Sequence, residues 1–312
     1  MRIAFVGKGG SGKTTLSSAF ALYSKEFFNE VLALDADINQ HLESTLFGIE
    51  RQKPSLSEAI MYLKEYIKGN NSLITDISEM LKTTPPGKGS QKLLLKGQHS
   101  FWDKYVSFSR GIKLINAGEI TEDDIGTKCY HAKTGSIELL LNHLKDERDE
   151  CIIIDMTAGA DAFSSGLFTK FDMTCVIVEP TFKSLSVFHQ YKKYCTEFNV
   201  CLYAVGNKIL NEDDILFLKS QLGPDLLAVF YMEQKVRENE RGELYEVMEL
   251  DVKNQQTLSS IIHALKEQKR DWDHYQQQTY FFHKKNALSW GNASVGKDLS
   301  LQIDPGFSYK DW

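Results

Sequence analysis

Short apolar runs alternate with helical patterns over most of the chain. Continuous apolar runs of strand length occupy residues 1–5, 31–35, 111–116, 151–155, 173–178 and 200–205. Apolar residues recur at helical spacing in residues 16–28, 134–146, 183–197 and 212–221. Strands that are apolar along their whole length are covered on both faces. The pattern therefore predicts an α/β fold, with a doubly wound, mostly parallel sheet and helices on each side.

Two segments break this alternation. Residues 51–100 hold two polar amphipathic helical patterns and the irregular loop 83–90, which together predict a surface insertion beside the ligand site. Residues 271–312 hold three of the four tryptophans without a clear period. We expect this aromatic-rich extension to pack back on the domain, with a partner-docking arm as the alternative. The predicted organisation is one domain over residues 1–270, with the insertion at about 51–100, followed by the extension.

Composition excludes several classes of protein. The chain has 36 basic and 42 acidic side chains, a net charge of −6, which argues against direct binding of nucleic acid. No apolar run is long enough to span a membrane, and the first strand begins almost at Met1, so we expect neither a transmembrane segment nor a signal peptide but a cytoplasmic protein. Four cysteines lie in or beside apolar strands and helices and are predicted to fill the core: Cys151, Cys175, Cys195 and Cys201.

A phosphate-binding motif joins the first predicted strand to the first predicted helix. Residues 7–14 read G-K-G-G-S-G-K-T and fit G-x-x-x-x-G-K-[ST]. In such a loop, backbone N–H groups and the helix N-terminus face the phosphates. Lys13 would reach the β- and γ-phosphates, and the Thr14 hydroxyl would bind Mg²⁺. The predicted nucleotide-binding residues here are Gly9, Gly10, Ser11, Gly12, Lys13, Thr14 and Thr15.

A second lysine inside the loop narrows the class. With Lys8, the chain reads K-G-G-x-G-K-T-T, which resembles the deviant phosphate loop of the ParA/MinD superfamily of dimeric ATPases. The resemblance implies slow ATP hydrolysis to ADP and phosphate in an ATP-dependent homodimer. In that family the early lysine crosses the dimer interface to the partner's nucleotide, which would make Lys8 catalytic. The alternative is a solvated loop lysine.

Three aspartates follow predicted strands, where ligands of parallel sheets gather. The resemblance assigns the D-A-D segment at 35–37 to switch I, with Asp37 orienting or activating the attacking water and Asp35 supporting Mg²⁺ through water. The alternative is that both aspartates only cap the helix from about residue 39. Asp155 ends an apolar strand in the form of a Walker-B/switch II segment and would hold the Mg²⁺ shell together with Thr14.

The sequence also indicates which base the bound nucleotide carries. Gly206-Asn207-Lys208-Ile209-Leu210 places Leu210 where guanine-specific GTPases have the aspartate of N-K-x-D, so the nucleotide should be ATP. Asn207 matches the superfamily asparagine that contacts adenine. The superfamily's proline-containing adenine loop is replaced by F-Y-M-E-Q at 230–234, which leaves the rest of the base pocket open.

Residues 111–208 resemble most closely the CooC-type ATPases, which help to deliver nickel to carbon monoxide dehydrogenase. The likeness rests on residues 126–131, 155–159, 178–184 and 205–208. Where that family has Cys-x-Cys, this chain has Cys129-Tyr130-His131. Two copies would supply two thiolates and two imidazoles, a set that suits Zn²⁺ or Ni²⁺ bridging a dimer. The alternative is a loop cysteine beside a solvated His131.

Three functions stay open at this point. The leading hypothesis is a metal-cofactor maturation ATPase of the CooC type. A positioning ATPase like ParA or MinD is the first alternative, and an ATP-gated switch for an unknown protein client is the second. A shared iron–sulfur cluster, as in the nitrogenase iron protein, is not expected, because residues 156–174 contain no cysteine.

Overall fold

The computed structural model describes residues 1–49, 53–97, 100–119, 131–159, 163 and 166–312. An eight-stranded sheet forms its centre, and neighbouring strands are parallel except for β4, which pairs antiparallel with β5 at one edge. In sheet order the strands are β10 (Leu226–Tyr231), β9 (Leu202–Ile209), β8 (Met173–Val178), β1 (Arg2–Gly7), β7 (Glu150–Met156), β2 (Glu30–Ala36), β5 (Ile112–Asn116) and β4 (Ser107–Ser109). The predicted α/β fold with a mostly parallel sheet is confirmed.

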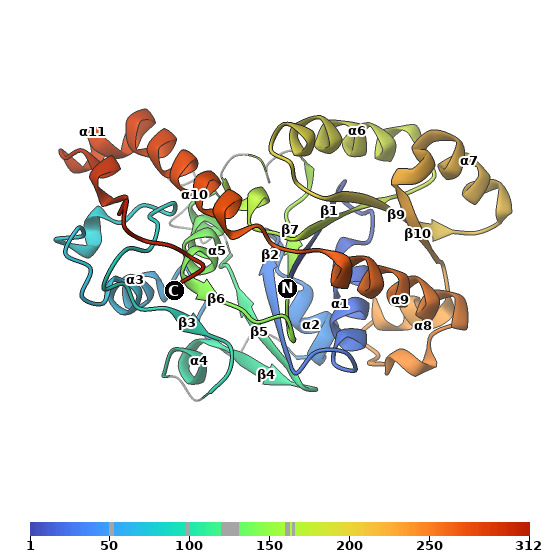
Figure 1. Cartoon of the computed structure of the whole chain (residues 1–312). Coiled ribbons are helices and arrows are strands. Elements are labelled where there is room, and N and C mark those ends of the chain that lie inside the picture. The colour runs from blue at the N-terminus through green and yellow to red at the C-terminus, as the bar shows by residue number, and fades with distance from the viewer. Residues whose placement is uncertain (50–52, 98–99, 120–130, 160–162, 164–165) are drawn as a thin grey trace.

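Helices cover both faces of the sheet (Figure 1). Alternate residues of β1 point into two different apolar clusters, Ile3 and Phe5 into one, Ala4 and Val6 into the other. The first cluster contains residues of α1 (Lys13–Ser24), α2 (Leu42–Phe47) and α9 (Val252–Glu267). The second contains residues of α3 (Ile60–Lys68), α4 (Ser100–Tyr105), α5 (His131–His143), α6 (Phe182–Glu197) and α7 (Glu212–Leu222). No helix in the described ranges is long and apolar enough to cross a membrane.

One helix ends earlier than the sequence suggested. The spacing predicted a helix over residues 134–146, but α5 stops at His143. The next two residues form β6 (Leu144–Lys145), which pairs in parallel with β3 (Leu93–Leu94). Backbone pairing with a segment fifty residues upstream in the chain therefore takes precedence over the local helical pattern.

Part of the segment 51–100, which was predicted to be a surface insertion, is buried against the rest of the domain. In its described part, Leu63, Ile67 and Leu93 are fully buried in the same cluster as α5, and the residues from Thr83 to Gly87 are also buried. Of the two predicted helical patterns, the described residues of the segment form one α-helix, α3. Short apolar faces that look weak in sequence are sufficient here because they meet α5 rather than solvent.

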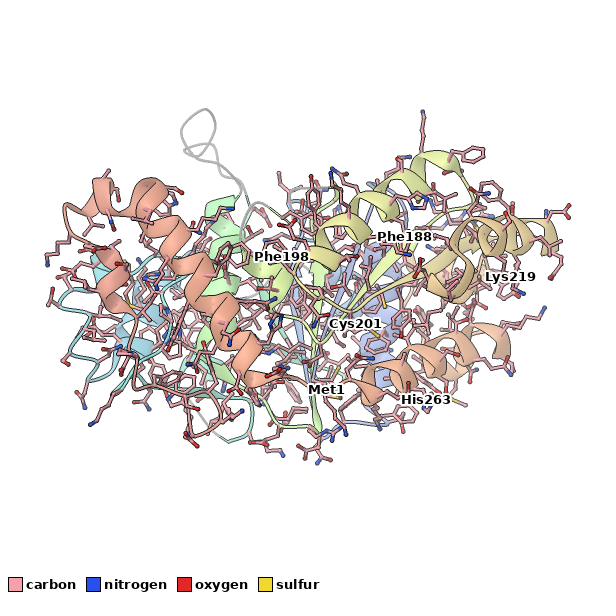
Figure 2. The ribbon with its side chains drawn as sticks, turned by 45° about the horizontal axis from the view of Figure 1, so that its top comes forward. Met1, Phe188, Phe198, Cys201, Lys219 and His263 are labelled. Carbon is pink, nitrogen blue, oxygen red and sulfur yellow. The ribbon has the colours of Figure 1, made fainter. Side chains whose placement is uncertain are left out.

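The C-terminal extension packs on the domain through its aromatic side chains. It consists of α10 (Trp272–Asn286), a π-helical turn (Ala287–Gly291), α11 (Asn292–Val295) and an irregular tail. Phe282 packs against Phe168 and Phe198. Phe198 lies at the end of α6, next to α10 (Figure 2). Tyr275 and Tyr309 are buried and their rings meet edge to face. Packing, the first of the two interpretations, is what the structure shows.

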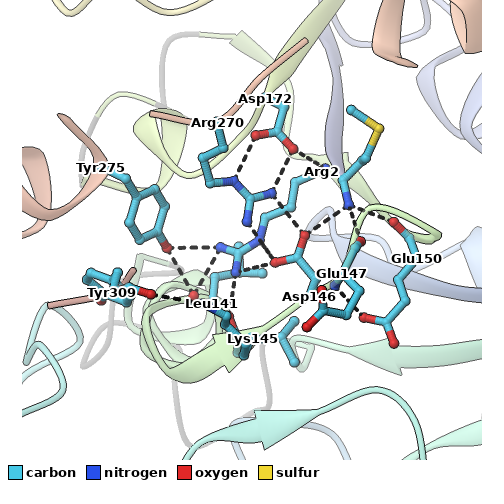
Figure 3. A network of polar contacts seen from close by, with 12 residues as sticks. Arg2, Leu141, Lys145, Asp146, Glu147, Glu150, Asp172, Arg270, Tyr275 and Tyr309 are labelled. Carbon is cyan, nitrogen blue, oxygen red and sulfur yellow. Dashed lines mark hydrogen bonds and ion pairs between the residues drawn. The ribbon is translucent and has the colours of Figure 1, made fainter. Parts of the chain in front are cut away.

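A buried polar network fastens the extension to the amino end of the sheet (Figure 3). Arg270 forms ion pairs with Asp146 and Asp172, and Arg2 pairs with Asp146 from the start of β1. Burial alone would raise the pKa of Asp146, but Arg2 and Arg270 outweigh it and hold that pKa well below its usual range. The Tyr275 hydroxyl accepts a hydrogen bond from Arg2 and so brings α10 into the network.

Candidate nucleotide-binding site

The predicted phosphate-binding loop lies between β1 and α1, at the carboxyl edge of the sheet. Its shape depends on glycine at two positions. Gly12 has φ +91°, and a Cβ there would lie 2.1 Å from the Asn207 amide nitrogen. A Cβ on Gly7, with φ +150°, would lie 2.6 Å from the Ile177 carbonyl oxygen. No other residue type fits both the backbone conformation and the space.

Four of the predicted site residues meet beside this loop. Lys13 is 6% exposed, and its ammonium lies 3.7 Å from the Asp37 carboxylate. The Thr14 hydroxyl donates a hydrogen bond of 2.6 Å to Asp155. These side chains come from the loop, from the end of β2 and from the end of β7, so the sheet brings together residues far apart in sequence.

The buried carboxylates at this edge fit a hard cation. Burial raises the pKa of Asp155 to about 7, although the Thr14 hydroxyl and Lys13 act to lower it. Burial, followed by the charge of Asp155, raises the pKa of Asp35 well above its usual range. One oxygen of Asp155 has no hydrogen-bond partner among the described residues. A carboxylate oxygen beside a threonine hydroxyl is a donor set that suits Mg²⁺.

Asp35 also has a structural role, as the capping interpretation predicted. Its two carboxylate oxygens accept hydrogen bonds from the N–H groups of Asp37 and Leu42. Asp37 accepts in turn from the N–H of Asn39. Asp35 therefore fixes the loop that carries Asp37 at the start of α2, and its participation in a Mg²⁺ shell stays a prediction.

Asn207 lies between the loop and a second pocket. Its side-chain N–H donates to the Ser11 carbonyl at 2.7 Å, a contact that the sequence did not predict. The same residue lines a cavity of about 260 Å³ that adjoins the loop. The described residues around it are Gly12, Thr15, Asn207, Lys208, Tyr231, Met232, Val236, Arg237 and Glu240. Tyr231 and Met232 come from the segment that replaces the proline-containing adenine loop, so this cavity is the candidate base pocket.

Lys208 is a loop contact that sequence reasoning missed. Its ammonium donates to the Gly10 carbonyl at 2.6 Å and pairs with Glu179 at 2.7 Å. Lys208 has φ +59°, an uncommon conformation for a residue with a Cβ, and such strain concentrates at functional positions. The lysine of the N-K pair was visible in the sequence, but nothing there indicated that it reaches back to the loop.

Three predicted residues remain without a described partner or position. The Lys8 side chain is half-buried, and its ammonium has no hydrogen bond or ion pair within the described part of the chain. Cys129 and the side chain of His131 lie outside the described residues, so the metal site predicted there stays a prediction. The four core cysteines are free thiols, three buried and Cys201 half-buried.

Comparison with known proteins places this site in a family. The model of the CobQ/CobB/MinD/ParA nucleotide binding domain matches residues 3–278. An ATP-binding protein of Methanocaldococcus jannaschii is 30% identical over 246 residues, which cover 77% of this chain and 88% of that protein. The carbon monoxide dehydrogenase accessory protein CooC of Rhodospirillum rubrum is 26% identical over 219 residues, 70% of this chain and 78% of CooC.

A solved structure shows the same fold at lower identity. The ParA family ATPase of Chlorobium tepidum TLS superposes with a TM-score of 0.56 at 18% identity, covering 84% of this chain and 98% of that one. The resemblance drawn from Lys8 and the phosphate motif agrees with the family match, with the 30% identical relative from Methanocaldococcus jannaschii and with the geometry of the loop. This chain belongs to the CobQ/CobB/MinD/ParA family of nucleotide-binding domains.

Proposed function

We propose that this protein is an ATPase that acts as a nucleotide-dependent switch. The observation that carries the proposal is the meeting of Lys13, Thr14, Asp37 and Asp155 around a glycine-shaped loop at the carboxyl edge of the sheet. The β- and γ-phosphates of ATP would lie against the loop N–H groups and Lys13, with the base in the pocket beside Asn207.

In the proposed mechanism, hydrolysis begins when Lys13 exchanges its ion pair with Asp37 for one with the phosphates of ATP. The phosphates carry more charge than the Asp37 carboxylate, so Lys13 would leave Asp37 when ATP binds. Asp37 would then orient a water molecule for in-line attack on the γ-phosphate. Thr14 and Asp155 would hold Mg²⁺, with Asp35 behind them; the ion, when bound, supplies positive charge to the phosphate oxygens.

The dimer is the next step of the proposal. Lys8 extends from the loop without a partner in the described part of the chain, and in the resembled superfamily this lysine crosses to the nucleotide of a second subunit. ATP would therefore hold two copies together, and hydrolysis would release them. Slow turnover is expected, because the product of such a cycle is the change between dimer and monomer.

We propose metal-cofactor maturation as the purpose of this cycle. The support is the identity to CooC, whose name describes an accessory protein of carbon monoxide dehydrogenase, together with Cys129 and His131 in place of the family's Cys-x-Cys. A metal ion bound by both residues from two subunits would be cargo, taken up in one nucleotide state and released in the other. The chemistry of two thiolates and two imidazoles favours Zn²⁺ or Ni²⁺.

The test is elemental analysis by mass spectrometry beside size-exclusion chromatography in ATP. Wild type should carry close to half a metal ion per chain in the dimer, and Cys129→Ala with His131→Ala should remove it. Cys201→Ala with His263→Ala is the matched control and should leave the metal content unchanged, because these two side chains are separate in the fold (Figure 2). An ATP-dependent dimer without metal would favour a positioning ATPase of the ParA/MinD type or a switch for another protein client.

A further inference from the structure

A second pocket lies next to the loop that carries Asp37. It has a volume of about 430 Å³ and is bounded by the first turn of α2, by residues before and after that helix, by the end of β5 and by Glu119. The described residues around it include Gln40, His41, Glu43, Asn116 and Glu119. None of these residues has a part in the nucleotide site described above.

Glu43 is buried at this pocket without a compensating charge. It is 2% exposed, and one carboxylate oxygen accepts a hydrogen bond of 2.6 Å from the Asn116 amide. The other oxygen has no hydrogen-bond partner, and no basic side chain in the described ranges forms an ion pair with Glu43. Burying a carboxylate without a positive partner costs folding free energy, and a positive group that approached it would offset that cost.

The neighbouring side chains present further acceptors. The Asn116 amide oxygen, at a residue 5% exposed, is also without a partner among the described residues. Both amide atoms of Gln40 are buried and unpartnered in that same set, and Gln40 has φ +48°, a conformation uncommon for a residue with a Cβ. Gln40 can turn either its oxygen or its nitrogen to the pocket. Glu119 adds a second acidic side chain at the rim.

These features favour an organic cation over a metal ion. Arginine and lysine side chains carry only donors, which match a buried carboxylate and unpartnered amide oxygens. A metal ion is disfavoured because no three His, Cys, Asp or Glu side chains of the described chain are grouped so as to hold one. The cavity is also far larger than a single ion needs.

We propose that this pocket binds a basic side chain, arginine or lysine, presented by a protein partner of the ATPase. Gln40 and His41 lie three and four residues after Asp37 in the same loop, so the bound side chain would hold the loop that carries Asp37. This inference rests on the proposed ATPase function, and it assigns to Glu43 the role of recognising the partner.

Binding can be tested with small probes on the full chain. N-acetyl-arginine amide and N-acetyl-lysine amide are titrated while amide shifts are followed by NMR, with N-acetyl-citrulline amide as the uncharged analogue. At least one basic probe should bind wild type and should bind Glu43→Gln at least tenfold more weakly, whereas the citrulline probe should not bind. Glu212→Gln is the matched control, since Glu212 is an exposed acid in the first turn of α7.

Stability gives a second and independent readout. If the role of Glu43 is to bind a ligand, Glu43→Gln should raise the melting temperature of the protein without probe, while Glu212→Gln should not. A lower melting temperature in Glu43→Gln would show a structural carboxylate and overturn the proposal. Equal binding of a basic probe by wild type and Glu43→Gln would also overturn it, as would Ca²⁺ binding that depends on Glu43.

The same samples separate this inference from the proposed function. Each variant is titrated with a fluorescent ATP analogue, and Glu43→Gln should bind it as wild type does. Nucleotide binding without binding of either basic probe would reject the pocket assignment and leave the ATPase intact. Failure of wild type to bind nucleotide would reject the proposed function itself.

Discussion

The Lys13 ammonium lies 3.7 Å from the Asp37 carboxylate, so the side chain assigned to phosphate binding is paired with the side chain assigned to water activation. Both groups are largely buried. In the proposed mechanism, a nucleotide would replace Asp37 as the partner of Lys13. The pair would then link phosphate binding to the repositioning of Asp37.

This relationship predicts opposite effects on binding and on hydrolysis. In Asp37→Asn, the rate of ATP hydrolysis should fall at least about 100-fold, because the general base or water-orienting carboxylate is lost. The Kd for ATP should stay equal or decrease, because Lys13 no longer has a competing anion. Phosphate release measures the first quantity and a fluorescent ATP analogue the second.

Lys13→Gln is the companion variant and should lose affinity for ATP. Weaker binding of ATP by Asp37→Asn would show that Asp37 supports the nucleotide rather than competing with it, and would contradict the proposed change of partner. Asp213→Asn, an exposed position in the first turn of α7, should leave both measurements unchanged.

The raised pKa of Asp155 predicts that the stability of the protein depends on pH. Burial raises this pKa to about 7, against about 3.9 in the unfolded chain. Between these values the folded protein holds a proton that the unfolded chain has released, so the free energy of unfolding falls as pH rises through this window and is level above it. Asp35, whose pKa is also raised by burial, adds to the same trend.

Asp155→Asn should therefore flatten the pH dependence of the melting temperature. The variant should gain stability relative to wild type above pH 7 and lose that advantage near pH 4, because there the wild-type carboxyl is protonated as well. Melting curves without nucleotide across this range provide the measurement. An unchanged slope would show that Asp155 does not titrate as its burial requires.

The sequence was sufficient for the sheet and for the centre of the site because both have short-range signals. Continuous apolar runs identified β1, β2, β7 and β8, and the spacing of Gly7, Gly12 and Lys13 identified the loop. The expected ends of strands also placed Asp37 and Asp155 at one edge, since the carboxyl ends of parallel strands meet there. The structure brings these residues within contact of Lys13 and Thr14.

What the sequence missed depends on contacts between distant segments. The apolar faces in 51–100 looked weak because α5, which covers them, lies far along the chain. Lys208 gave no sign that it reaches the Gly10 carbonyl, and α10 was hidden by aromatic residues that have low helix propensity. Glu43 had an ordinary helical position in the sequence; only burial shows it to be unusual.

Removing the contact between Lys208 and the phosphate-binding loop should have a modest effect on the affinity for ATP. Lys208→Met removes the hydrogen bond to Gly10 and should weaken ATP binding roughly fivefold, a limited loss because the side chain is 39% exposed and its pair with Glu179 is partly screened. Lys208→Arg should recover part of the affinity. Lys219→Met, at an exposed position on α7, is the control and should bind ATP as wild type does (Figure 2). Equal affinity in Lys208→Met would show that the loop holds its shape without this contact.

The ion pairs of Arg270 are expected to contribute to the free energy of unfolding, because they join the C-terminal extension to the domain. The guanidinium of Arg270 donates two hydrogen bonds to each of Asp146 and Asp172, and the side chain is only 12% exposed. Arg270→Ala leaves Asp172 without its ion-pair partner and should lower the free energy of unfolding by about 3 kcal/mol, measured by urea denaturation. Lys310→Ala removes only an exposed ion pair with Asp273 and should change stability by less than about 0.5 kcal/mol.

The effect of Arg270→Ala should also depend on pH. Arg270 lowers the pKa of Asp146, together with Arg2, and the pKa of Asp172, in each case against the opposing effect of burial. Groups with lowered pKa values stabilise the fold above their unfolded pKa, and that stability is lost as pH falls. The difference between wild type and Arg270→Ala should therefore narrow below about pH 4, where the unfolded carboxylates bind protons. A difference that stays constant with pH would assign the stabilisation to packing of Arg270 against Trp272 rather than to its charge.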